Sequence, residues 1–361
     1  MQRRFLRAAE MFFTGLGTAV PPRSFSQAEC WEAVQRARSP ALTARTRAVL
    51  QGILTHDSGI ARRALALDSL DESFEIDPDT LHRRFERHAP ALASQAAAQA
   101  LAQARLQAGD IDAVVVSTCT GYLCPGLTSY VTERAGLRGD VLALDLVGQG
   151  CGAALPNLRA AEALIASGRC EHVLCICVEV CSAAFYLDQD LGVLVSACLF
   201  GDGAGAVVAS RAPRDGVPRV EWKAAASFTD PRARDALRFE QRGGMLRNVL
   251  TLPVPRLAAD RAREVLDRVL EGEGLARADI GAWIMHAGGR KVLEELQARI
   301  GLAPPDLAWS AAMLRDFGNL SSPFVLFVLR AALEGGAPRG WWWMSSFGAG
   351  FSCHGALLRV A

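Results

Sequence analysis

The sequence predicts an α/β fold made of two similar halves. Short apolar runs rich in β-branched residues alternate with longer runs rich in Ala and Leu, a pattern typical of strands connected by helices. The same order of helix, turn and strand occurs twice along the chain, which indicates an internal repeat. The 361 residues, 50% of them hydrophobic, are sufficient for two units with a large buried core.

The first half, residues 1–215, contains a series of expected strands and one long helix. A first strand and its turn are expected over residues 11–20. The Ala-rich residues 91–108 predict a helix that ends before Gly109. Further strands are expected at residues 112–118, 141–147, 173–180 and 204–209. Their nearly continuous apolar sequence is typical of strands covered on both faces.

The second half, residues 216–361, repeats this order. A helical run over residues 261–273 leads through an Asp-Ile pair into a strand that ends at His286, where the first half has Cys119. Cys151 follows Cys119 by 32 residues, and Asn319 follows His286 by 33. Ligand sites of open α/β sheets lie beyond the carboxyl ends of strands. The repeat therefore predicts that Cys151, His286 and Asn319 lie close together.

Cys151 is the candidate nucleophile. It lies in VGQGCGAALP, where the surrounding glycines permit a sharp turn from a strand into a helix. The positive end of that helix, together with a hydrogen bond or ion pair from His286, is expected to lower the pKa of the thiol. The alternative is a small residue packed at a tight turn.

His286 and Asn319 are the candidate donors. A lone histidine is often structural, and an Asn before a helix beginning near Ser321 could be an N-cap. Together with Cys151 they fit one reaction, because a thiolate can hold an acyl chain as a thioester. The imidazole and carboxamide N–H groups can stabilise the enolate left when a malonyl thioester loses carbon dioxide. This decarboxylative Claisen condensation requires no metal or redox cofactor.

Five motifs, QGCGAA, LFGDGAG, HAGG, GNLSS and FGAGFS, resemble the signatures of plant chalcone synthases and bacterial type III polyketide synthases. They occur in the family's order, and the resemblance covers residues 12–361. It implies a thiolase-like αβαβα layered fold, a homodimer, and an acyl-CoA starter and malonyl-CoA as substrates. It also implies iterative extension on Cys151 and cyclisation to a pyrone or phenolic product, with alkylpyrones and alkylresorcinols among the candidates.

The resemblance further implies roles for residues around the site. Phe200 matches a gatekeeper phenylalanine between a CoA tunnel and a cavity, and Pro125 matches a cis-proline loop that reaches toward the partner's cavity. Positions of the cavity wall and of a cyclisation network match Cys119, Thr120, Cys124, Glu179, Cys181, Ala184 and Ser321. Small side chains in this set suggest room for a long acyl starter, unless Tyr122, Phe185 or Tyr186 fills the space.

The chain departs from the family where the phosphates of CoA are bound. The aligned region, LQGILTHDSG, contains no Lys or Arg. Arg45, Arg47, Arg62 and Arg63 are the candidate substitutes. Two alternatives to the family remain: a ketoacyl synthase III, although that family has HQAN where this chain has HAGG, and an inactive scaffold subunit, although the triad is intact.

The composition argues against several other function classes. The 39 basic and 38 acidic side chains leave a net charge of +1, with no basic patch for nucleic acid or a membrane surface. No apolar run is long enough to span a bilayer, and the N-terminus is interpreted as a strand start rather than a signal peptide.

The ten cysteines are expected to be free thiols in a reducing cytoplasm, since a disulfide framework is typical of small secreted chains. No second Cys/His pair with metal spacing accompanies Cys175 and Cys177, so no zinc site is expected. Six cysteines in apolar sequence are expected to be buried: Cys119, Cys124, Cys175, Cys177, Cys181 and Cys198.

Overall fold

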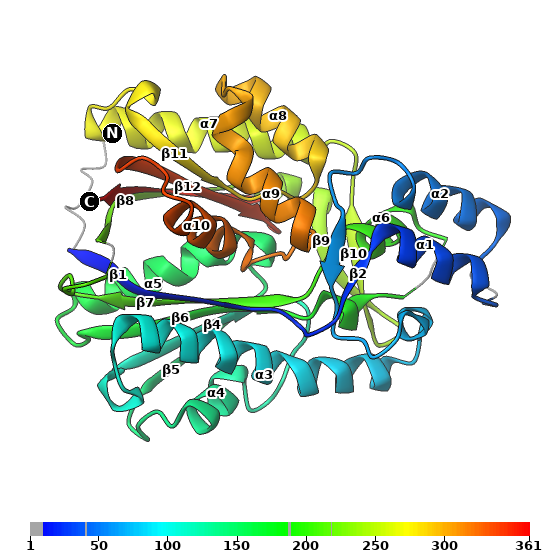
Figure 1. The fold of residues 1–361 in the computed structure, drawn as a ribbon, viewed down its shortest axis with the longest axis horizontal. Coiled ribbons are helices and arrows are strands. Elements are labelled where there is room, and N and C mark those ends of the chain that lie inside the picture. Colours follow the sequence, from blue (N-terminus) through cyan, green and yellow to red (C-terminus); the bar gives the residue numbers. More distant parts are fainter. Residues whose placement is uncertain (1–9, 40–41, 187–188, 218) are drawn as a thin grey trace.

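Groups of helices and strands alternate through the molecule in five layers. The computed structural model describes residues 10–361 except 40–41, 187–188 and 218; the first nine residues, to which the signal-peptide alternative refers, lie outside this range. From top to bottom, Figure 1 shows outer helices, strands of the second half, central helices, strands of the first half, and the outer helices of the other side. These helices are α7 (Val254–Glu273) and α8 (Arg290–Ile300), α5 (Ala154–Ala166) and α10 (Phe324–Glu334), and α3 (Pro78–Ala104) and α4 (Leu127–Ala135). The expected αβαβα order is confirmed.

The two halves have the same strand pairing. The first half contains β1 (Met11–Ala19), β4 (Ala113–Thr118), β5 (Leu142–Val147), β6 (His172–Glu179) and β7 (Gly203–Ser210). The second contains β8 (Val220–Thr229), β11 (Ile280–Met285), β12 (Gly340–Gly348) and β13 (Ser352–Val360). β4 is parallel to β6, which is antiparallel to β7, just as β11 is parallel to β12, which is antiparallel to β13. β7 and β13 then pair with β1 and β8 in the same antiparallel sense. The halves are therefore equivalent, as the internal repeat predicted, while the boundary at residues 215–216 stays a prediction.

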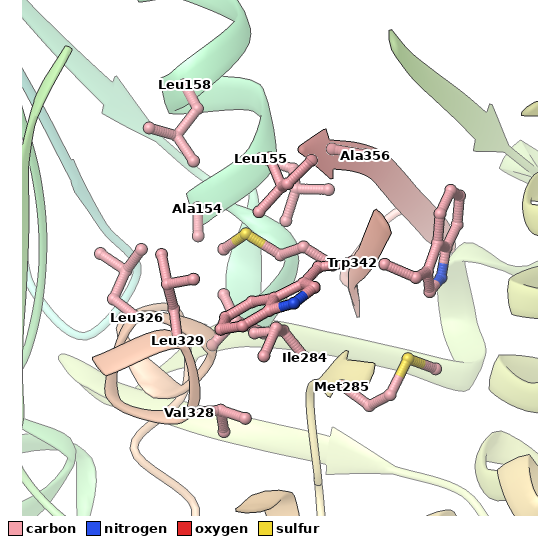
Figure 2. Close-up of a cluster of buried hydrophobic side chains, with 14 of the residues drawn as sticks. Ala154, Leu155, Leu158, Ile284, Met285, Leu326, Val328, Leu329, Trp342 and Ala356 are labelled. Carbon is pink, nitrogen blue, oxygen red and sulfur yellow. The ribbon is translucent and has the colours of Figure 1, made fainter. Parts of the chain in front are cut away.

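The halves join at a short seam between β1 and β8. Only three residue pairs form it, Met11 with Trp222, Phe12 with Glu221 and Phe13 with Val220. Beyond the seam α5 and α10 lie between the two groups of strands, and each helix contacts strands of both halves. Figure 2 shows this core, where Leu155 of α5 and Leu329 of α10 lie near Trp342 of β12. Burial of these apolar side chains on both faces stabilises the arrangement.

Buried polar groups fix α5 against the strands below it. Asn157 is fully buried, and its side-chain amide donates to the carbonyl oxygens of Val115 at 3.1 Å and Ile176 at 3.0 Å. It also donates to the hydroxyl of Ser117 at 2.8 Å. Because a buried amide is costly without such partners, these bonds fix the position of the helix that follows Cys151.

The outer helix α3 is longer than the sequence indicated and ends earlier. It begins after Asp77, whose side chain accepts from the Thr80 N–H at 2.8 Å, with Pro78 at the first position. It ends at Ala104, because Arg105 adopts a left-handed conformation with φ of 53°. The prediction of residues 91–108 was wrong at both ends, since Arg105 ends the helix in a role usually taken by glycine.

The remaining elements lie mainly around the strand ends that carry the site. The helices are α1 (Gln27–Arg36), α2 (Ala44–Leu54), α6 (Leu191–Leu199) and α9 (Ala308–Phe317), and the strands are β2 (Ser24–Ser26), β3 (Arg62–Ala64), β9 (Leu237–Arg242) and β10 (Met245–Leu250). Short 3-10 turns occupy Leu70–Phe74, Ala108–Asp110, Gly150–Gly152, Cys181–Ala184, Pro231–Ala236, Arg277–Asp279 and Pro304–Leu307. Within the described residues, every helix is too short or too polar to cross a membrane.

One expected buried strand is exposed. β5 lies at the end of the sheet, and its one strand partner among the residues that the structure describes is β4. Leu142 is 43% exposed and Val147 is 49% exposed, so covering on both faces was a wrong expectation for this strand. β4, β6 and β7 are buried as predicted, because each has a strand on either side.

Helix α3 approaches β1 closely because both present small residues. A Cβ at Gly17 would lie 2.1 Å from the Ala96 carbonyl oxygen, and a Cβ at Gly15 would lie 2.0 Å from that of Ala100. These contacts are with backbone atoms, which a side-chain rotation cannot relieve. The glycines therefore set the distance between the outer helix and the sheet.

We expect Gly17→Ala to lower the free energy of unfolding by about 1–3 kcal/mol, the usual cost of overpacking a tight core. Chemical denaturation followed by circular dichroism measures this. Gly139→Ala is the matched control, because no atom lies within 4 Å of a Cβ placed there; it should change stability by less than about 1 kcal/mol. Equal effects of the two substitutions would contradict the packing argument.

Candidate active site

Cys151 lies in a turn that the glycines make possible. After β5 the chain passes through Gly148 and Gly150, with φ of 85° and 59°, values that favour glycine. Cys151 is half-buried in the following 3-10 turn, directly before α5. The predicted strand-to-helix turn is confirmed.

The end of β12, in the second half, packs against this turn. The hydroxyl of Ser346, in β12, donates to the Gly152 carbonyl oxygen at 3.0 Å. A Cβ at Gly348 would lie 2.5 Å from the Gly152 nitrogen, so the end of β12 approaches the nucleophile turn backbone to backbone. The FGAGFS motif therefore has a packing role beside Cys151.

His286 follows β11 and is held in an aromatic enclosure. Its backbone N–H donates to the Ser345 carbonyl oxygen at 2.9 Å. Its ring lies edge-on to Phe324 and Phe347, at centroid distances of 5.3 and 4.9 Å. The residue is 1% exposed, and neither ring nitrogen has a hydrogen-bond partner within the described chain. Burial lowers the pKa of His286 to about 3, so the imidazole is neutral at physiological pH.

Asn319 is fixed through both ends of its amide. Its Nδ2 donates to the Gly288 carbonyl oxygen at 3.3 Å, and its Oδ1 accepts from the Ser321 N–H at 2.9 Å. Its own N–H donates to the Leu199 carbonyl oxygen at 2.8 Å. Helix α10 begins only at Phe324, so both the N-cap alternative and the predicted start near Ser321 were wrong.

One cavity unites the three residues. It has a volume of about 660 Å³, and Cys151, His286 and Asn319 all line it, together with Phe200. Its outer part is bordered by α6, β10 and the start of α8. Side chains from both halves therefore meet in one space, as the repeat predicted. The arrangement can bind an elongated molecule whose reacting end lies beside the thiol.

The pairing of Cys151 with His286 was predicted wrongly. The Cys151 Sγ accepts from the Ser321 hydroxyl at 3.3 Å. Burial raises the pKa of Cys151 to about 12, opposite to the expected direction. A helix end and a charged histidine would favour the thiolate, but the enclosure removes water from Cys151 and His286 and favours their neutral forms.

A buried carboxyl lies behind Ser321. Oε1 of Glu179, at the end of β6, accepts from the Ser322 hydroxyl at 2.6 Å and from the Cys119 Sγ at 3.3 Å. Oε2 accepts from the Cys119 N–H at 3.0 Å and from the Thr120 hydroxyl at 2.9 Å. Ser321 lies 3.4 Å from Oε1, so a chain of polar contacts joins Glu179 to Cys151. Burial raises the pKa of Glu179.

Comparison with known proteins identifies the family. Residues 20–221 match the model described as FAE1/Type III polyketide synthase-like protein, and residues 229–361 match the chalcone and stilbene synthase C-terminal domain. The chain belongs to the type III polyketide synthase family. It is therefore an acyltransferase that condenses acyl-CoA thioesters, and this membership decides against the ketoacyl synthase III alternative.

Relatives of this type III polyketide synthase are found by sequence and by structure. A 3,5-dihydroxyphenylacetyl-CoA synthase of Streptomyces toyocaensis is 32% identical, over 90% of this chain and 83% of the relative. The α-pyrone synthesis polyketide synthase-like Pks18 of Mycobacterium tuberculosis is 27% identical, over 89% of this chain and 83% of the relative. The crystal structure of PKS-I from the brown alga Ectocarpus siliculosus has a TM-score of 0.89 at 26% identity, covering 99% of this chain and 100% of that one.

The expected wall residues of the synthase are only partly where the sequence suggested. Of the seven, Thr120, Glu179, Cys181 and Ser321 are buried, Cys119 and Ala184 are half-buried, and Cys124 is exposed. In the part of the chain that the structure describes, none of the seven borders the cavity at Cys151. The buried state predicted for Cys119 and Cys124 was wrong, because both follow β4 in an irregular segment. The Cys124–Pro125 bond is cis, as predicted.

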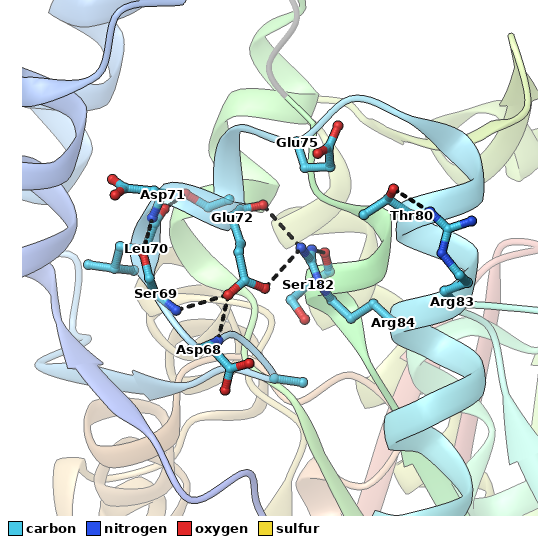
Figure 3. A network of polar contacts seen from close by, with 12 residues as sticks. Asp68, Ser69, Leu70, Asp71, Glu72, Glu75, Thr80, Arg83, Arg84 and Ser182 are labelled. Atoms are coloured by element: carbon cyan, nitrogen blue, oxygen red, sulfur yellow. Dashed lines mark hydrogen bonds and ion pairs between the residues drawn. The ribbon is translucent and has the colours of Figure 1, made fainter.

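The turn that carries Cys181 is tightly held. Cys181 belongs to an apolar cluster with Phe185 and Phe200. The guanidinium of Arg84, in α3, donates to the Ser182 carbonyl oxygen at 2.7 Å and to that of Glu72 at 3.1 Å, a network visible in Figure 3. Phe185 and Tyr186 are each 5% exposed. These contacts favour the alternative in which large neighbouring side chains fill the space.

Two of the four arginines proposed for the CoA phosphates are engaged elsewhere. Arg63 is 3% exposed and donates to the carbonyl oxygens of Ala197 at 2.7 Å and Phe200 at 2.8 Å. Arg47 donates to the Val34 and Ala37 carbonyl oxygens. Arg45 and Arg62 are exposed, but neither lines the cavity at Cys151. Sequence order alone could not distinguish these roles.

The raised pKa of Cys151 leads to a pH prediction. Because a thiol with a pKa of about 12 is almost entirely protonated at pH 7, its thiolate fraction grows about tenfold with each pH unit. We expect alkylation of Cys151 by iodoacetamide to accelerate by about that factor per unit from pH 7 to pH 10. Peptide mass spectrometry measures the rate at Cys151, with exposed Cys124 in the same digest as the reagent control. A rate that is already constant below pH 8 would instead restore the ion pair with His286.

Proposed function

We propose that this synthase extends an acyl-CoA starter with malonyl-CoA by repeated decarboxylative condensation, with Cys151 as the nucleophile and His286 and Asn319 as the donors. The observation that carries the proposal is the shared cavity, which brings the thiol, an imidazole with two unpartnered nitrogens and an oriented carboxamide together. The reaction requires no cofactor beyond the CoA thioesters themselves.

The first step transfers the starter to the enzyme. The Cys151 sulfur attacks the thioester carbonyl, and the thiol proton passes to the unprotonated ring nitrogen of His286. The bond between the carbonyl carbon and the CoA sulfur then breaks, and the departing thiolate takes that proton. A neutral imidazole suits this role, because it offers a lone pair to the proton. Because its pKa is about 3, His286 holds this proton only in passing, between the Cys151 sulfur and the departing thiolate.

The second step forms the new carbon–carbon bond. Malonyl-CoA loses carbon dioxide, and the electron pair of the broken bond enters an enolate whose oxygen accepts from His286 and from the Asn319 Nδ2. The enolate carbon attacks the Cys151 thioester, and the Cys151 thiolate leaves. The aromatic rings of Phe200 and Phe347 border the same space, where a water-poor surrounding strengthens both donor contacts. The lengthened chain then returns to Cys151 for the next cycle.

The class of product is supported by the relatives. One group is described as 3,5-dihydroxyphenylacetyl-CoA synthases and another as α-pyrone synthesis enzymes, so we propose a phenolic or pyrone product for this synthase. The packed turn at Cys181 supports a short acyl starter over the long starter that the small side chains suggested. A reducing cytoplasm is proposed as the compartment, because all ten cysteines are free.

We expect Cys151→Ala to abolish product formation while carbon dioxide release from malonyl-CoA continues, because His286 and Asn319 still stabilise the enolate. His286→Ala should lower both by at least about a hundredfold, the usual loss on removing such a donor. Product mass spectrometry and a carbon dioxide assay with a panel of starters measure the two outcomes. Cys170→Ala, a buried cysteine distant in sequence from the motifs, is the matched control. Continued elongation by Cys151→Ala would refute the nucleophile, and no carbon dioxide release by the wild type would favour the scaffold alternative.

We also propose that the synthase is a homodimer that covers β5. Within the described residues, this edge strand leaves one row of backbone donors and acceptors without a neighbouring strand, and proteins normally cover or charge such edges. The strand LALDLV instead carries exposed Leu142 and Val147. A second copy placed against it would bury both apolar side chains.

We expect Leu142→Lys to shift the protein from dimer toward monomer, because a buried charge without a partner opposes association. Sedimentation velocity at micromolar concentration measures the shift. Leu252→Lys, at an 87% exposed leucine beside the cavity, is the matched control and should remain dimeric. A wild-type monomer at this concentration would contradict the dimer itself.

A further inference from the structure

One lysine lies at the rim of the active-site cavity. Of the 39 basic side chains only two are lysines, at positions 223 and 291. Lys223 pairs with Glu221 at 2.5 Å. Lys291, in the first turn of α8, is exposed, lines the cavity and has no ion pair within the described part of the chain.

The other charged side chains of the rim pair with one another and leave Lys291 without a partner. Arg290 bonds to Asp57 and to Glu294, the latter at 2.9 Å. All three side chains border the cavity. One guanidinium is therefore shared by two carboxylates, and Lys291 brings the net charge of these four side chains to zero. The ammonium group is the one cation of the set that is available to an incoming anion.

The start of helix α8, beside Lys291, also offers backbone N–H groups to a ligand. Helix α8 has Gly289 at its N-cap and no side-chain cap, so no side chain binds its first N–H groups, although the N–H of Val292 donates to the Gly289 carbonyl oxygen at 3.0 Å. Such a helix end attracts anions through these donors and through the helix dipole. A Cβ at Gly289 would meet only Leu199 at 3.6 Å, an ordinary contact. Packing within the protein therefore does not require this glycine, and the space is open to a ligand.

A separate feature indicates that a ligand extends from the rim of the cavity to its buried end. His286 is 1% exposed, has no partner for either ring nitrogen within the described residues, and lines the same cavity as Lys291. Unsatisfied buried polar groups are uncommon in proteins and often mark a binding site. A molecule that reaches from His286 to Lys291 would place its reactive end at Cys151 and its other end at the start of α8.

We propose that Lys291 and the N-terminus of α8 bind a phosphate group of the CoA thioester. They would replace the basic residues that LQGILTHDSG lacks. Lysine binds phosphate as a point charge, and the helix N–H groups add directional donors. The assignment rests on the proposed function, which requires CoA thioesters in this cavity.

The two lysines allow a direct binding test that does not depend on turnover. Wild-type protein is treated with an N-hydroxysuccinimide ester of acetic acid, alone, with free CoA, or with pantetheine, and acetylation of each lysine is followed by peptide mass spectrometry. CoA should slow acetylation of Lys291 at least about fivefold and leave Lys223 unchanged. Pantetheine lacks phosphate and should protect Lys291 little. No protection by CoA, or equal protection by pantetheine, would overturn the assignment, even in an active enzyme.

Kinetics supply the second measurement. In Lys291→Ala, the ratio of kcat/KM for an acyl-CoA to that for the corresponding N-acetylcysteamine thioester should fall about tenfold, through KM for the CoA substrate. Lys291→Arg should restore most of the ratio because the positive charge returns. Lys223→Ala is the control and should retain the wild-type ratio. An unchanged ratio in Lys291→Ala would exclude a phosphate contact, whereas a wild type inactive toward every thioester would refute the proposed function instead.

Discussion

The contact between the nucleophile turn and the end of β12 is the constraint on which the site depends. Gly348 approaches Gly152 so closely that a Cβ would lie 2.5 Å from its nitrogen, and Ser346 bonds to the same residue. This contact joins the two halves where Cys151 must face His286 and Asn319. Asn157 fixes the other side by binding α5 to the first-half strands. The nucleophile is thus positioned by both halves together.

The burial of Cys151 and His286 also determines the charge state of both side chains. Enclosure by Phe324 and Phe347 leaves His286 neutral, and the same lack of water holds the proton on Cys151. An ion pair formed in advance would give a more reactive thiol, but it would also expose that thiol to adventitious electrophiles. With neutral partners, the nucleophile becomes reactive when a thioester brings its carbonyl into the cavity.

The sequence was sufficient for the strands, the repeat and the three residues around the cavity. Those features follow from apolar runs and spacing, which depend on local sequence. The sequence did not predict features that depend on contacts between residues far apart in the chain. Arg105 ends α3 in a conformation usually taken by glycine, β5 is exposed by its position in the strand order, and Arg63 binds carbonyl oxygens of a distant helix. Ser322 and Asn157 were missed, although Ser322 directly follows Ser321 in GNLSS and could have been suspected.

The three-pair seam between β1 and β8 has a consequence for how the chain folds. The seam is short, and α5 and α10 add further contacts between the halves, because each helix packs against strands of both. Each of these helices is apolar on the faces it turns to both sheets, so a half separated from the other would expose one of them to water. The two repeats are therefore not independent domains but one cooperative unit, in which neither copy reaches its native core alone.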